Sequence, residues 1–287
     1  MGYVLVAGVA AATALAVAYI LLRLAERFQW HPEIRPRDVH QTPTPRLGGI
    51  AVFAGMTAGV IVASQLGYFD DVFANPRAII AVFIAAGIVL ALGVIDDVID
   101  LDWLTKLSGQ FLAAGVVAWQ GVQIVSLPIG GLTLFSPTLS LILTVLAIVV
   151  VMNAVNFIDG LDGLVVGVAL ISNGVFFLYS FVLSLGDQGA PYFGLATILT
   201  VLLAGALVGF LPWNWNPAKL FLGDSGALLV GLMMSVSAVS VTGQIDPGAL
   251  NPTQLLPAFL PVILPLAVLI VPLLDFSLAV MRRLRRG

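Results

Sequence analysis

The sequence predicts an all-α protein that crosses a membrane many times. Of its 287 residues, 60% are hydrophobic and only 9% are charged, whereas about a quarter of the residues in a soluble domain are charged. Apolar runs of about 20 residues, the length that a transmembrane helix needs, recur along the whole chain. This pattern argues against a soluble domain with a single anchor. The 287 residues contain no cysteine, which excludes a disulfide framework and thiol chemistry.

Nine apolar windows meet the length requirement, and we expect each to form a transmembrane helix. They are 3–22, 47–66, 78–95, 105–121, 138–156, 163–185, 193–211, 225–243 and 255–280. The connections between them are polar or rich in Gly and Pro. Among them, 122–137 fits either a small β-hairpin or an ordinary loop. Because no linker is long enough to separate domains, we expect one transmembrane domain over 1–287.

Basic residues indicate the orientation, because short cytoplasmic loops carry the excess of Lys and Arg. With the N-terminus outside, eleven of the twelve basic residues fall on the inner side, and Arg77 is the exception. The eleven are Arg23, Arg27, Arg35, Arg37, Arg46, Lys106, Lys219, Arg282, Arg283, Arg285 and Arg286. The sequence therefore predicts an outer N-terminus and a cytoplasmic C-terminus. The first apolar run has no basic residue before it, so it predicts a helix and not a cleaved signal.

Acidic residues gather at the predicted cytoplasmic ends of these helices. They are Asp96, Asp97, Asp100, Asp102, Asp159, Asp162 and Asp224. Acidic residues contribute little to membrane orientation, so the topology does not explain them. Because they come from three different inner connections, we expect them to form one site.

The motif GVIDDVIDLDWLTKLSGQ at 93–110 joins the third predicted helix to the fourth. Asp96 and Asp97 end one helix, and Lys106 opens the next. Adjacent like charges raise one another's proton affinity unless a cation is near. Carboxylates beside a lysine suit a metal-bound, phosphate-rich substrate. A solvated loop with a lysine that reaches to the interface accounts for this single motif about equally well.

The motif NAVNFIDGLDGL at 153–164 follows an almost unbroken apolar run. Asn156, Asp159 and Asp162 are three residues apart, so they share one face if the helix continues. Asp162 alone would serve as the N-cap of the next helix. Asn153, Asn156 and Asp159 would be costly in lipid without partners. Ionisable residues at such positions predict a functional site.

The motif LPWNWNPAKLFLGDSGALLVG at 211–231 places Asp224 where the eighth predicted helix begins. Asp224 fits a simple helix cap, or a ligand of Mg²⁺, which takes one or two carboxylates plus substrate phosphates. Phe221 or a neighbouring Trp offers a flat face to a nucleobase, although core or lipid contact explains Phe221 better when this residue is taken alone. Helix N-termini on this side favour anions. Together the three motifs predict a diphosphate site at the membrane surface.

Four motifs, in this order, resemble those of the polyprenyl-phosphate N-acetylhexosamine-1-phosphate transferases. They are PTPRLGGIAVF, GVIDDVIDLDWLTKLSGQ, NAVNFIDGLDGL and NPAKLFLGDSG, within roughly 35–231. The resemblance implies transfer of a sugar 1-phosphate from a UDP-sugar to a polyprenyl phosphate, with release of UMP. It also implies a bacterial cytoplasmic membrane protein with its active site on the cytoplasmic face. DDVIDL and NFIDGLDG favour the N-acetylglucosamine branch over the phospho-MurNAc-pentapeptide branch.

The resemblance further implies roles for individual residues. Asp96, Asp97, Lys106 and Asp159 would be catalytic, with Asp97 as a base for the lipid phosphate and Lys106 in contact with phosphate. Asn156, Asp162, Asn214 and Phe221 would bind substrate, the last two through uracil. Asp224 would be the principal ligand of Mg²⁺, or of Mn²⁺ in its place. The expected partners are the UDP-sugar, the polyprenyl phosphate, the membrane and a second copy in a homodimer, without nucleic acid.

One feature departs from the family pattern. Family members continue past the ninth helix with a His-rich cytoplasmic loop and one or two further helices. This sequence stops at MRRLRRG, and His31 and His40 lie elsewhere. We therefore expect the 287 residues to lack that loop and the last helix or helices.

A rival interpretation from another class is an ion-coupled transporter. Transporter sites lie near the middle of the membrane, on broken helices in repeated halves. Here the acidic residues cluster at one predicted surface, and no repeat is visible, so we favour the transferase.

Overall fold

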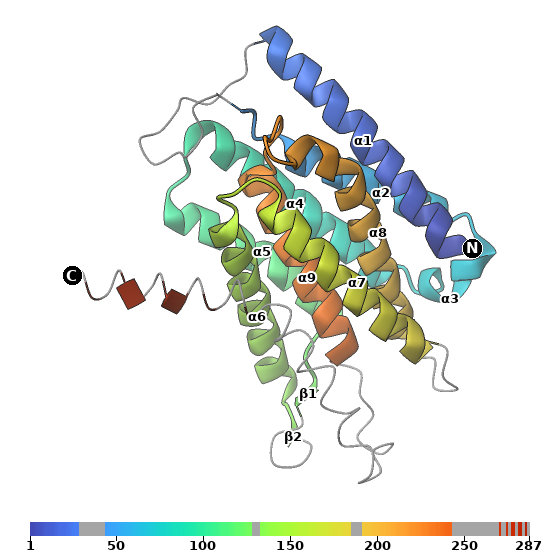
Figure 1. The fold of residues 1–287 in the computed structure, drawn as a ribbon. Helices are drawn as coiled ribbons and strands as arrows, with labels where there is room; N and C mark the ends of the chain where they lie inside the picture. The colour runs from blue at the N-terminus through green and yellow to red at the C-terminus, as the bar shows by residue number, and fades with distance from the viewer. Residues whose placement is uncertain are drawn as a thin grey trace.

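A computed structural model describes residues 1–28, 44–127, 133–184 and 191–242, with a few isolated positions between 270 and 285. These residues form a bundle of long helices (Figure 1). The long helices are α1 (Gly2–Phe28), α2 (Gly48–Ala63), α4 (Arg77–Ile99), α5 (Trp103–Trp119), α6 (Pro137–Ile158), α7 (Leu164–Ser184), α8 (Pro191–Asn214) and α9 (Gly223–Thr242). Each coincides with one of the first eight predicted windows. The ninth window, 255–280, lies almost wholly outside the described residues.

The described helices account for six membrane spans by length and composition, or seven if a bent pair counts as one. That pair is α2 followed by η1 (Gly67–Phe69) and α3 (Asp70–Phe73), with a bend of 96°. Helix α5, with 17 residues, falls just short of a span. The all-α membrane class is confirmed to this extent, while the number of nine spans and their orientation stay predictions.

The connection between α5 and α6 contains a small β-hairpin. Strand β1 (Ser126–Leu127) pairs antiparallel with β2 (Thr133–Leu134), and Ser126 lies opposite Leu134. Beside this pair, the amide of Phe135 donates a hydrogen bond of 3.0 Å to the carbonyl of Val125. Of the two alternatives for 122–137, the hairpin is correct.

Local capping explains where two helices begin. The carboxylate of Asp102 accepts hydrogen bonds of 3.0 Å from the amides of Leu104 and Thr105, which caps α5. The hydroxyl of Ser136 accepts one from the amide of Leu139 and caps α6. Such caps satisfy amides that have no partner inside the helix. Asp102 was expected in the acidic site, but its exposed side chain serves its own helix, where the short-range cap is available.

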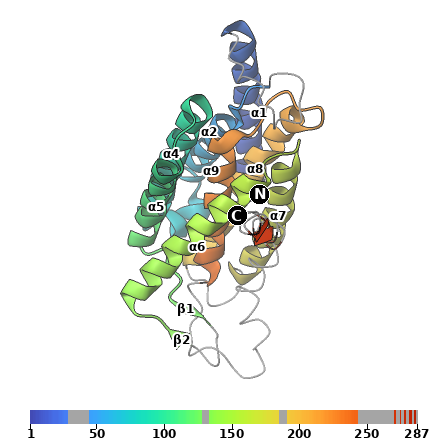
Figure 2. The same cartoon turned by 90° about the vertical axis from the view of Figure 1, so that its left-hand side faces the viewer.

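Helix α9 lies at the centre of the bundle (Figures 1 and 2). It contacts α2, α4, α6, α7 and α8, and 94% of its apolar window is buried, against 22% for α1. Small residues allow this close packing, since a Cβ at Gly231 would stand 2.7 Å from the Cα of Met152 on α6. Because neighbouring helices surround α9, the residues at its two ends are held in fixed positions relative to the rest of the bundle.

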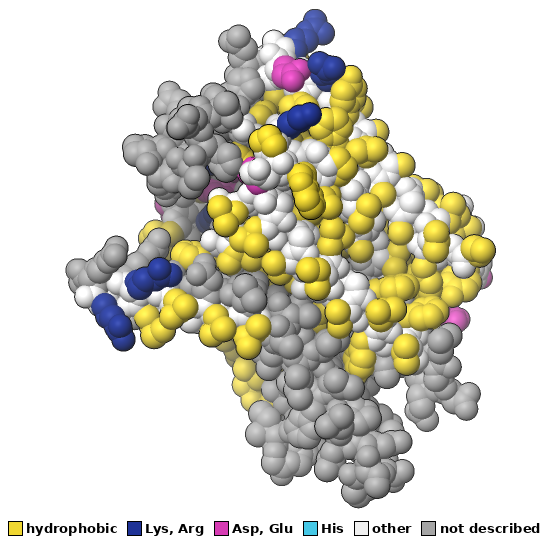
Figure 3. All heavy atoms as spheres, viewed as in Figure 1, with side chains coloured by type: hydrophobic (Ala, Val, Ile, Leu, Met, Phe, Trp, Pro, Cys, Tyr) yellow, Lys and Arg dark blue, Asp and Glu magenta, His cyan; other side chains and the backbone are white. Residues whose placement is uncertain are grey.

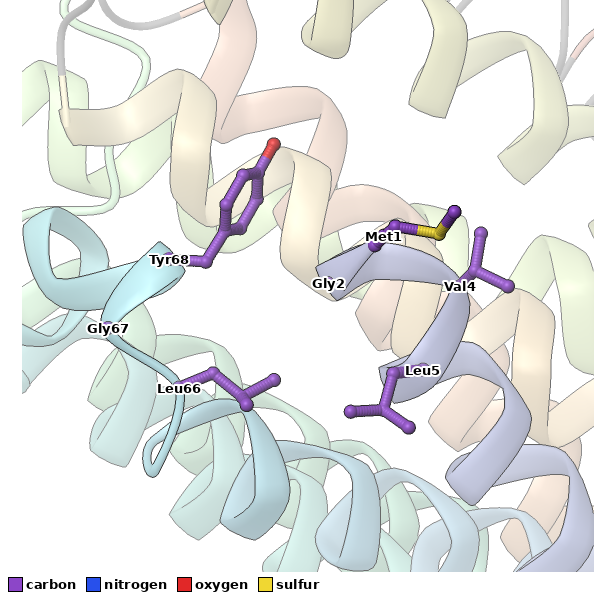
Figure 4. Close-up of a pocket in the computed structure, with 7 residues that line it drawn as sticks. All are labelled: Met1, Gly2, Val4, Leu5, Leu66, Gly67 and Tyr68. Atoms are coloured by element: carbon purple, nitrogen blue, oxygen red, sulfur yellow. The ribbon is translucent and has the colours of Figure 1, made fainter.

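Many large hydrophobic side chains are exposed on the outside of the bundle. They are spread over the described face in Figure 3, as lipid contact requires. A pocket of about 570 Å³ lies between the start of α1 and the turn after α2, lined by residues such as Leu5, Leu66 and Tyr68 (Figure 4). It is at the opposite end of α2 from Gly48, away from the acidic residues described next.

Candidate active site

Acidic, basic and amide side chains from four helices converge at one end of the bundle. Helices α4 and α6 end there, and α5 and α9 begin there. Hydrogen bonds connect Asp96, Lys106, Asn156 and Asp224 across these helices. The expectation that acidic residues from three connections form one site is met by Asp96, Asp97, Asp159 and Asp224.

Lys106 joins two carboxylates. Its ammonium group donates a hydrogen bond of 2.9 Å to Oδ2 of Asp96 and another to Oδ2 of Asp224. The Lys106 side chain is only 19% exposed and that of Asp96 is 9% exposed. Oδ1 of Asp96 also accepts a bond of 3.0 Å from the amide of Leu101. Lys106 is therefore a partly buried cation inside the site, and not a lysine that reaches out to solvent.

Asp224 receives contacts from two other helices at the start of α9. Besides Lys106 from α5, the side-chain amide of Asn156 in the last turn of α6 donates a hydrogen bond of 2.9 Å to its Oδ1. A carboxylate in the first turn of a helix also interacts favourably with the helix dipole. These contacts hold both oxygens of Asp224 in defined positions.

Asp97 has a different set of partners from its neighbour Asp96. Its Oδ1 accepts a hydrogen bond of 3.2 Å from the amide of Asp224, and its Oδ2 accepts one of 3.3 Å from the amide of Ser225. Both donors belong to the first turn of α9. The paired aspartates therefore split, one toward Lys106 and one toward the α9 backbone.

Asp159 lies just beyond the end of α6. The helix stops at Ile158, and the backbone of Asp159 (φ −77°, ψ 63°) leaves the helical path. Asn156, Asp159 and Asp162 therefore do not share one helix face, because the chain turns at Asp159. Burial, and after it the charges of Asp224 and Asp97, raise the pKa of Asp159 to about 7, while the charge of Arg46 opposes this rise.

Arg46 was interpreted from the sequence only as a sign of orientation. Its charge acts on both Asp97 and Asp159, so it lies close to the acidic cluster. The signal that could have revealed this was its place in PTPRLGGIAVF, two residues before Gly48. The backbone confirms that proximity, since the amide of Gly48 donates a hydrogen bond of 2.9 Å to the carbonyl of Phe221.

Asp162 and Asn214 tie the loop after α6 to the loop after α8. Oδ2 of Asp162 accepts hydrogen bonds of 3.0 Å from the side chain of Asn216 and from the amide of Ala218. The buried Asn214 accepts one of 3.1 Å from the amide of Gly163 and donates one of 3.1 Å to the carbonyl of Leu220. Asp162 is thus not the cap of α7. The roles of both residues in substrate binding stay predictions.

Phe221 is in the loop between α8 and α9, beside the start of α2. Its amide donates a hydrogen bond of 2.9 Å to the carbonyl of Pro45, and the amide of Gly49 donates one of 3.0 Å to the carbonyl of Leu222. Its ring is partly exposed. These bonds place the ring at the same end of the bundle as Asp224, and its stacking on uracil stays a prediction.

The sequence analysis named Asn153 but missed its partner, Gln110. Gln110 is completely buried, and its side chain exchanges hydrogen bonds with that of Asn153. Gln110 is one turn along α5 from Lys106, and Asn153 is one turn before Asn156 on α6. A glutamine inside an otherwise apolar helix was the available signal, because such a residue needs a partner in lipid.

The residues present fit a divalent cation bound together with substrate phosphates. Among the described residues, no three acidic or histidine side chains are grouped as a complete metal cage. Mg²⁺ does not need one, since it takes one or two carboxylates and completes its shell with phosphates and water. Burial is the main cause of the raised pKa of Asp159, and the negative charges of Asp224 and Asp97 add to it, with Arg46 only partly offsetting them. A cation at Asp224 would balance that charge.

The sequence comparison decides the family. The model described as glycosyl transferase family 4 matches residues 79–242, which is more than half of the chain. The chain belongs to this family. The matched region runs from α4 to α9 and so contains Asp96, Lys106, Asn156 and Asp224.

Named relatives of this family 4 member include three kinds of transferase. A decaprenyl-phosphate N-acetylglucosaminephosphotransferase of Mycobacterium leprae is 40% identical over 268 residues, covering 92% of this chain and 67% of the relative. A probable undecaprenyl-phosphate N-acetylglucosaminyl 1-phosphate transferase of Bacillus subtilis is 30% identical over 274 residues, covering 95% and 69%. A phospho-N-acetylmuramoyl-pentapeptide-transferase of Mycobacteroides abscessus is 30% identical over 277 residues, covering 83% and 76%. The chain spans about two thirds of the length of the first of these relatives, and the resemblance inferred from the four motifs is confirmed.

Proposed function

We propose that this chain transfers N-acetylglucosamine 1-phosphate from UDP-GlcNAc to a membrane polyprenyl phosphate and releases UMP. The observation that carries the proposal is Asp224 at the start of the central helix α9, contacted by Lys106 from α5 and Asn156 from α6. Family membership and the M. leprae relative, named for N-acetylglucosamine and decaprenyl phosphate, support the choice of sugar and lipid carrier. The product would enter cell-envelope polysaccharide synthesis.

The reaction is a phosphoryl-type transfer. An oxygen of the lipid phosphate forms a bond to the β-phosphorus of UDP-GlcNAc, the bond from that phosphorus to the bridging oxygen breaks, and UMP leaves. Such reactions depend mainly on positioning and on stabilisation of negative charge. A phosphate monoester has its second pKa near 6, so the lipid phosphate is largely ionised at neutral pH and needs no strong base.

The side chains of the site supply positive charge and orientation. Lys106 and Arg46 would attract the phosphates, together with the N-termini of the helices that begin at this end. Asn156 orients Asp224 through its hydrogen bond. Bound Mg²⁺, or Mn²⁺ in its place, would neutralise diphosphate charge, and Asp224 is the residue that would hold it.

One assay separates this function from its alternatives. The 287-residue chain in lipid nanodiscs with polyprenyl phosphate and Mg²⁺ is given UDP-GlcNAc, UDP-GalNAc or UDP-MurNAc-pentapeptide, and UMP is measured. We expect UMP from UDP-GlcNAc, and only with lipid phosphate present. UMP from the muramoyl donor alone would favour the pentapeptide transferase, to which the M. abscessus relative points. No UMP from any donor would contradict the proposed chemistry and reopen the transporter alternative.

We also propose that the site faces the cytoplasm of a bacterial cytoplasmic membrane, as the distribution of basic residues indicates. Because the sequence has no cysteine, single cysteines report orientation without background. Asp70→Cys, at the opposite end of the bundle, should react with an impermeant thiol reagent in intact cells, and Asp100→Cys should not. The reverse pattern would invert the topology. The homodimer stays a prediction that light scattering of the same nanodiscs would test.

A further inference from the structure

We propose that Asp97 is a positioning residue that caps α9 and thereby holds Asp224, and that it is not the base for the lipid phosphate. The inference rests on the proposed function, in which Asp224 binds the cation. Its starting point is the pair of hydrogen bonds from the amides of Asp224 and Ser225 to the two oxygens of Asp97, at 3.2 and 3.3 Å.

The residue before helix α9, Leu222, is apolar and cannot cap the helix with its side chain. The first amides of any helix lack partners inside the helix and are usually satisfied by Ser, Thr, Asp or Asn at the N-cap. Here the helix begins at Gly223, preceded by the apolar Leu222. The carboxylate of Asp224 is engaged with Lys106 and Asn156. A residue 127 positions earlier in the chain therefore supplies the cap.

Two glycines bring the short Asp97 side chain within reach. Gly93 lies one turn before Asp97 on the same face of α4, and a Cβ there would stand 2.2 Å from the Cα of Ser225. Gly223 has a positive φ of 74°, and a Cβ there would stand 2.7 Å from Oδ2 of Asp97. The backbones of α4 and α9 are thus in direct contact at the cap.

The start of α9 is also held from the other side. The amides of Gly48 and Gly49, at the beginning of α2, donate hydrogen bonds of 2.9 and 3.0 Å to the carbonyls of Phe221 and Leu222. The segment before Asp224 is anchored through its carbonyls, and the segment from Asp224 onward is anchored through its amides. Asp97 provides the second anchor, so its loss should let the first turn of α9 fray and displace Asp224.

This geometry fits a cap better than a base. A general base needs an oxygen directed at the proton that it removes, whereas each oxygen of Asp97 accepts a hydrogen bond from α9. The charge of a carboxylate at a helix N-terminus adds to the stabilisation. The lipid phosphate is already largely ionised at neutral pH, so the reaction does not need a general base to remove its proton.

The two roles predict different kinetics for Asp97→Asn and Asp97→Ala. As a cap, Asn keeps one acceptor and Ala keeps none, so the Mg²⁺ concentration for half-maximal UMP release should rise in the order wild type, Asn, Ala. The expected rise for Ala is roughly 2- to 30-fold, the equivalent of losing a helix cap, with much of the kcat recovered at high Mg²⁺. As a base, both variants should lose kcat equally at every Mg²⁺ concentration, with unchanged half-saturation, and that result would overturn the proposal.

A second measurement does not depend on activity. Hydrogen–deuterium exchange of the peptide that contains Asp224 and Ser225 should become faster in Asp97→Ala than in wild type, and less so in Asp97→Asn. Peptides from α1 should exchange unchanged, which shows that the variants are folded. Unchanged exchange at the start of α9 would refute the cap. If the wild type releases no UMP while exchange responds as expected, the proposed function fails and the cap stands.

Discussion

The side-chain amide of Asn156, at the end of α6, donates a hydrogen bond of 2.9 Å to the carboxylate of Asp224, at the start of α9. The two residues are 68 positions apart, and each alone has an ordinary local explanation. Their contact at one end of the bundle connects the second and third acidic motifs into one site.

Asn156→Ala should lower UMP release about 10- to 100-fold, because a hydrogen bond to a charged group contributes about 1.5–3 kcal/mol. Loss of the bond frees the orientation of Asp224 without changing any charge, so part of the rate should return at high Mg²⁺. The measurement is UMP release against Mg²⁺ concentration. Val150→Ala, on an exposed face of the same helix, is the control and should behave as wild type. Unaltered kinetics of Asn156→Ala would show that the contact does not matter.

Lys106→Met should destabilise the protein by about 3 kcal/mol, because it leaves Asp96 and Asp224 without the cation between them. Adding Asp96→Asn should restore part of the stability, since one of the two uncompensated charges is removed, but it should not restore UMP release. Thermal unfolding in detergent gives the first result, and the UMP assay gives the second.

The exposed pair Arg23–Glu26 provides the control for this experiment. Its side chains are 63% and 52% exposed, and exposed pairs contribute little. Glu26→Ala should therefore change unfolding by less than about 1 kcal/mol. If Lys106→Met has as small an effect as Glu26→Ala, the interpretation of Lys106 as a partly buried cation that stabilises the site is wrong.

Gly93→Ala should lower both stability and activity, because the added Cβ would stand 2.2 Å from the backbone of Ser225. Overpacking of this kind costs about 1–3 kcal/mol, and here it displaces the first turn of α9. Gly87→Ala on the same helix meets nothing within 4 Å and should be neutral or slightly stabilising, since alanine favours helix. Thermal unfolding of both variants provides the comparison, and equal effects would argue against tight packing of α4 on α9.

Gln110 and Asn153 should show a coupling of about 1 kcal/mol in a double-mutant cycle of Gln110→Leu and Asn153→Leu, measured by unfolding in detergent. The pair keeps α5 and α6 in register, and these helices carry Lys106 and Asn156. Thr57→Val removes a hydrogen bond within α2 alone and should show no coupling to Asn153→Leu. Independent effects of the two leucine variants would mean that the amides do not act as a pair.

Much of the fold follows from patterns that local sequence contains. Apolar runs defined the first eight helices, and alternation with Pro and Gly allowed the hairpin at 122–137. Alternating spans also bring every second connection to the same end, which is why Asp96, Asp159 and Asp224 could be expected together. Membrane helices are especially easy to predict from sequence, because a chain in lipid must satisfy its backbone hydrogen bonds internally and few secondary structures do so.

The side-chain positions that the sequence did not predict depend on contacts between distant parts of the chain, which no local pattern shows. Asp102 was expected in the site and instead caps α5, and the hydrogen bonds of Asp162 to the loop after α8 were not foreseen. Asp97 and Asp96 are adjacent in sequence, yet one faces α9 and the other faces Lys106. Only the packing of α4 against α9, set by Gly93, decides between those directions.

The most direct test of the account is Mg²⁺-dependent UMP release by Asp224→Asn. If Asp224 binds the metal ion, its replacement removes a negative charge that the reaction needs. If Asp224 only capped a helix, its replacement would lower the free energy of unfolding by about 1 kcal/mol. The matched control is Asp102→Asn, which alters a carboxylate that serves only the start of α5. We predict that Asp224→Asn keeps its cooperative unfolding but releases no UMP at any Mg²⁺ concentration, while Asp102→Asn stays active. Near-normal turnover of Asp224→Asn at ordinary Mg²⁺ would contradict the assignment of the site.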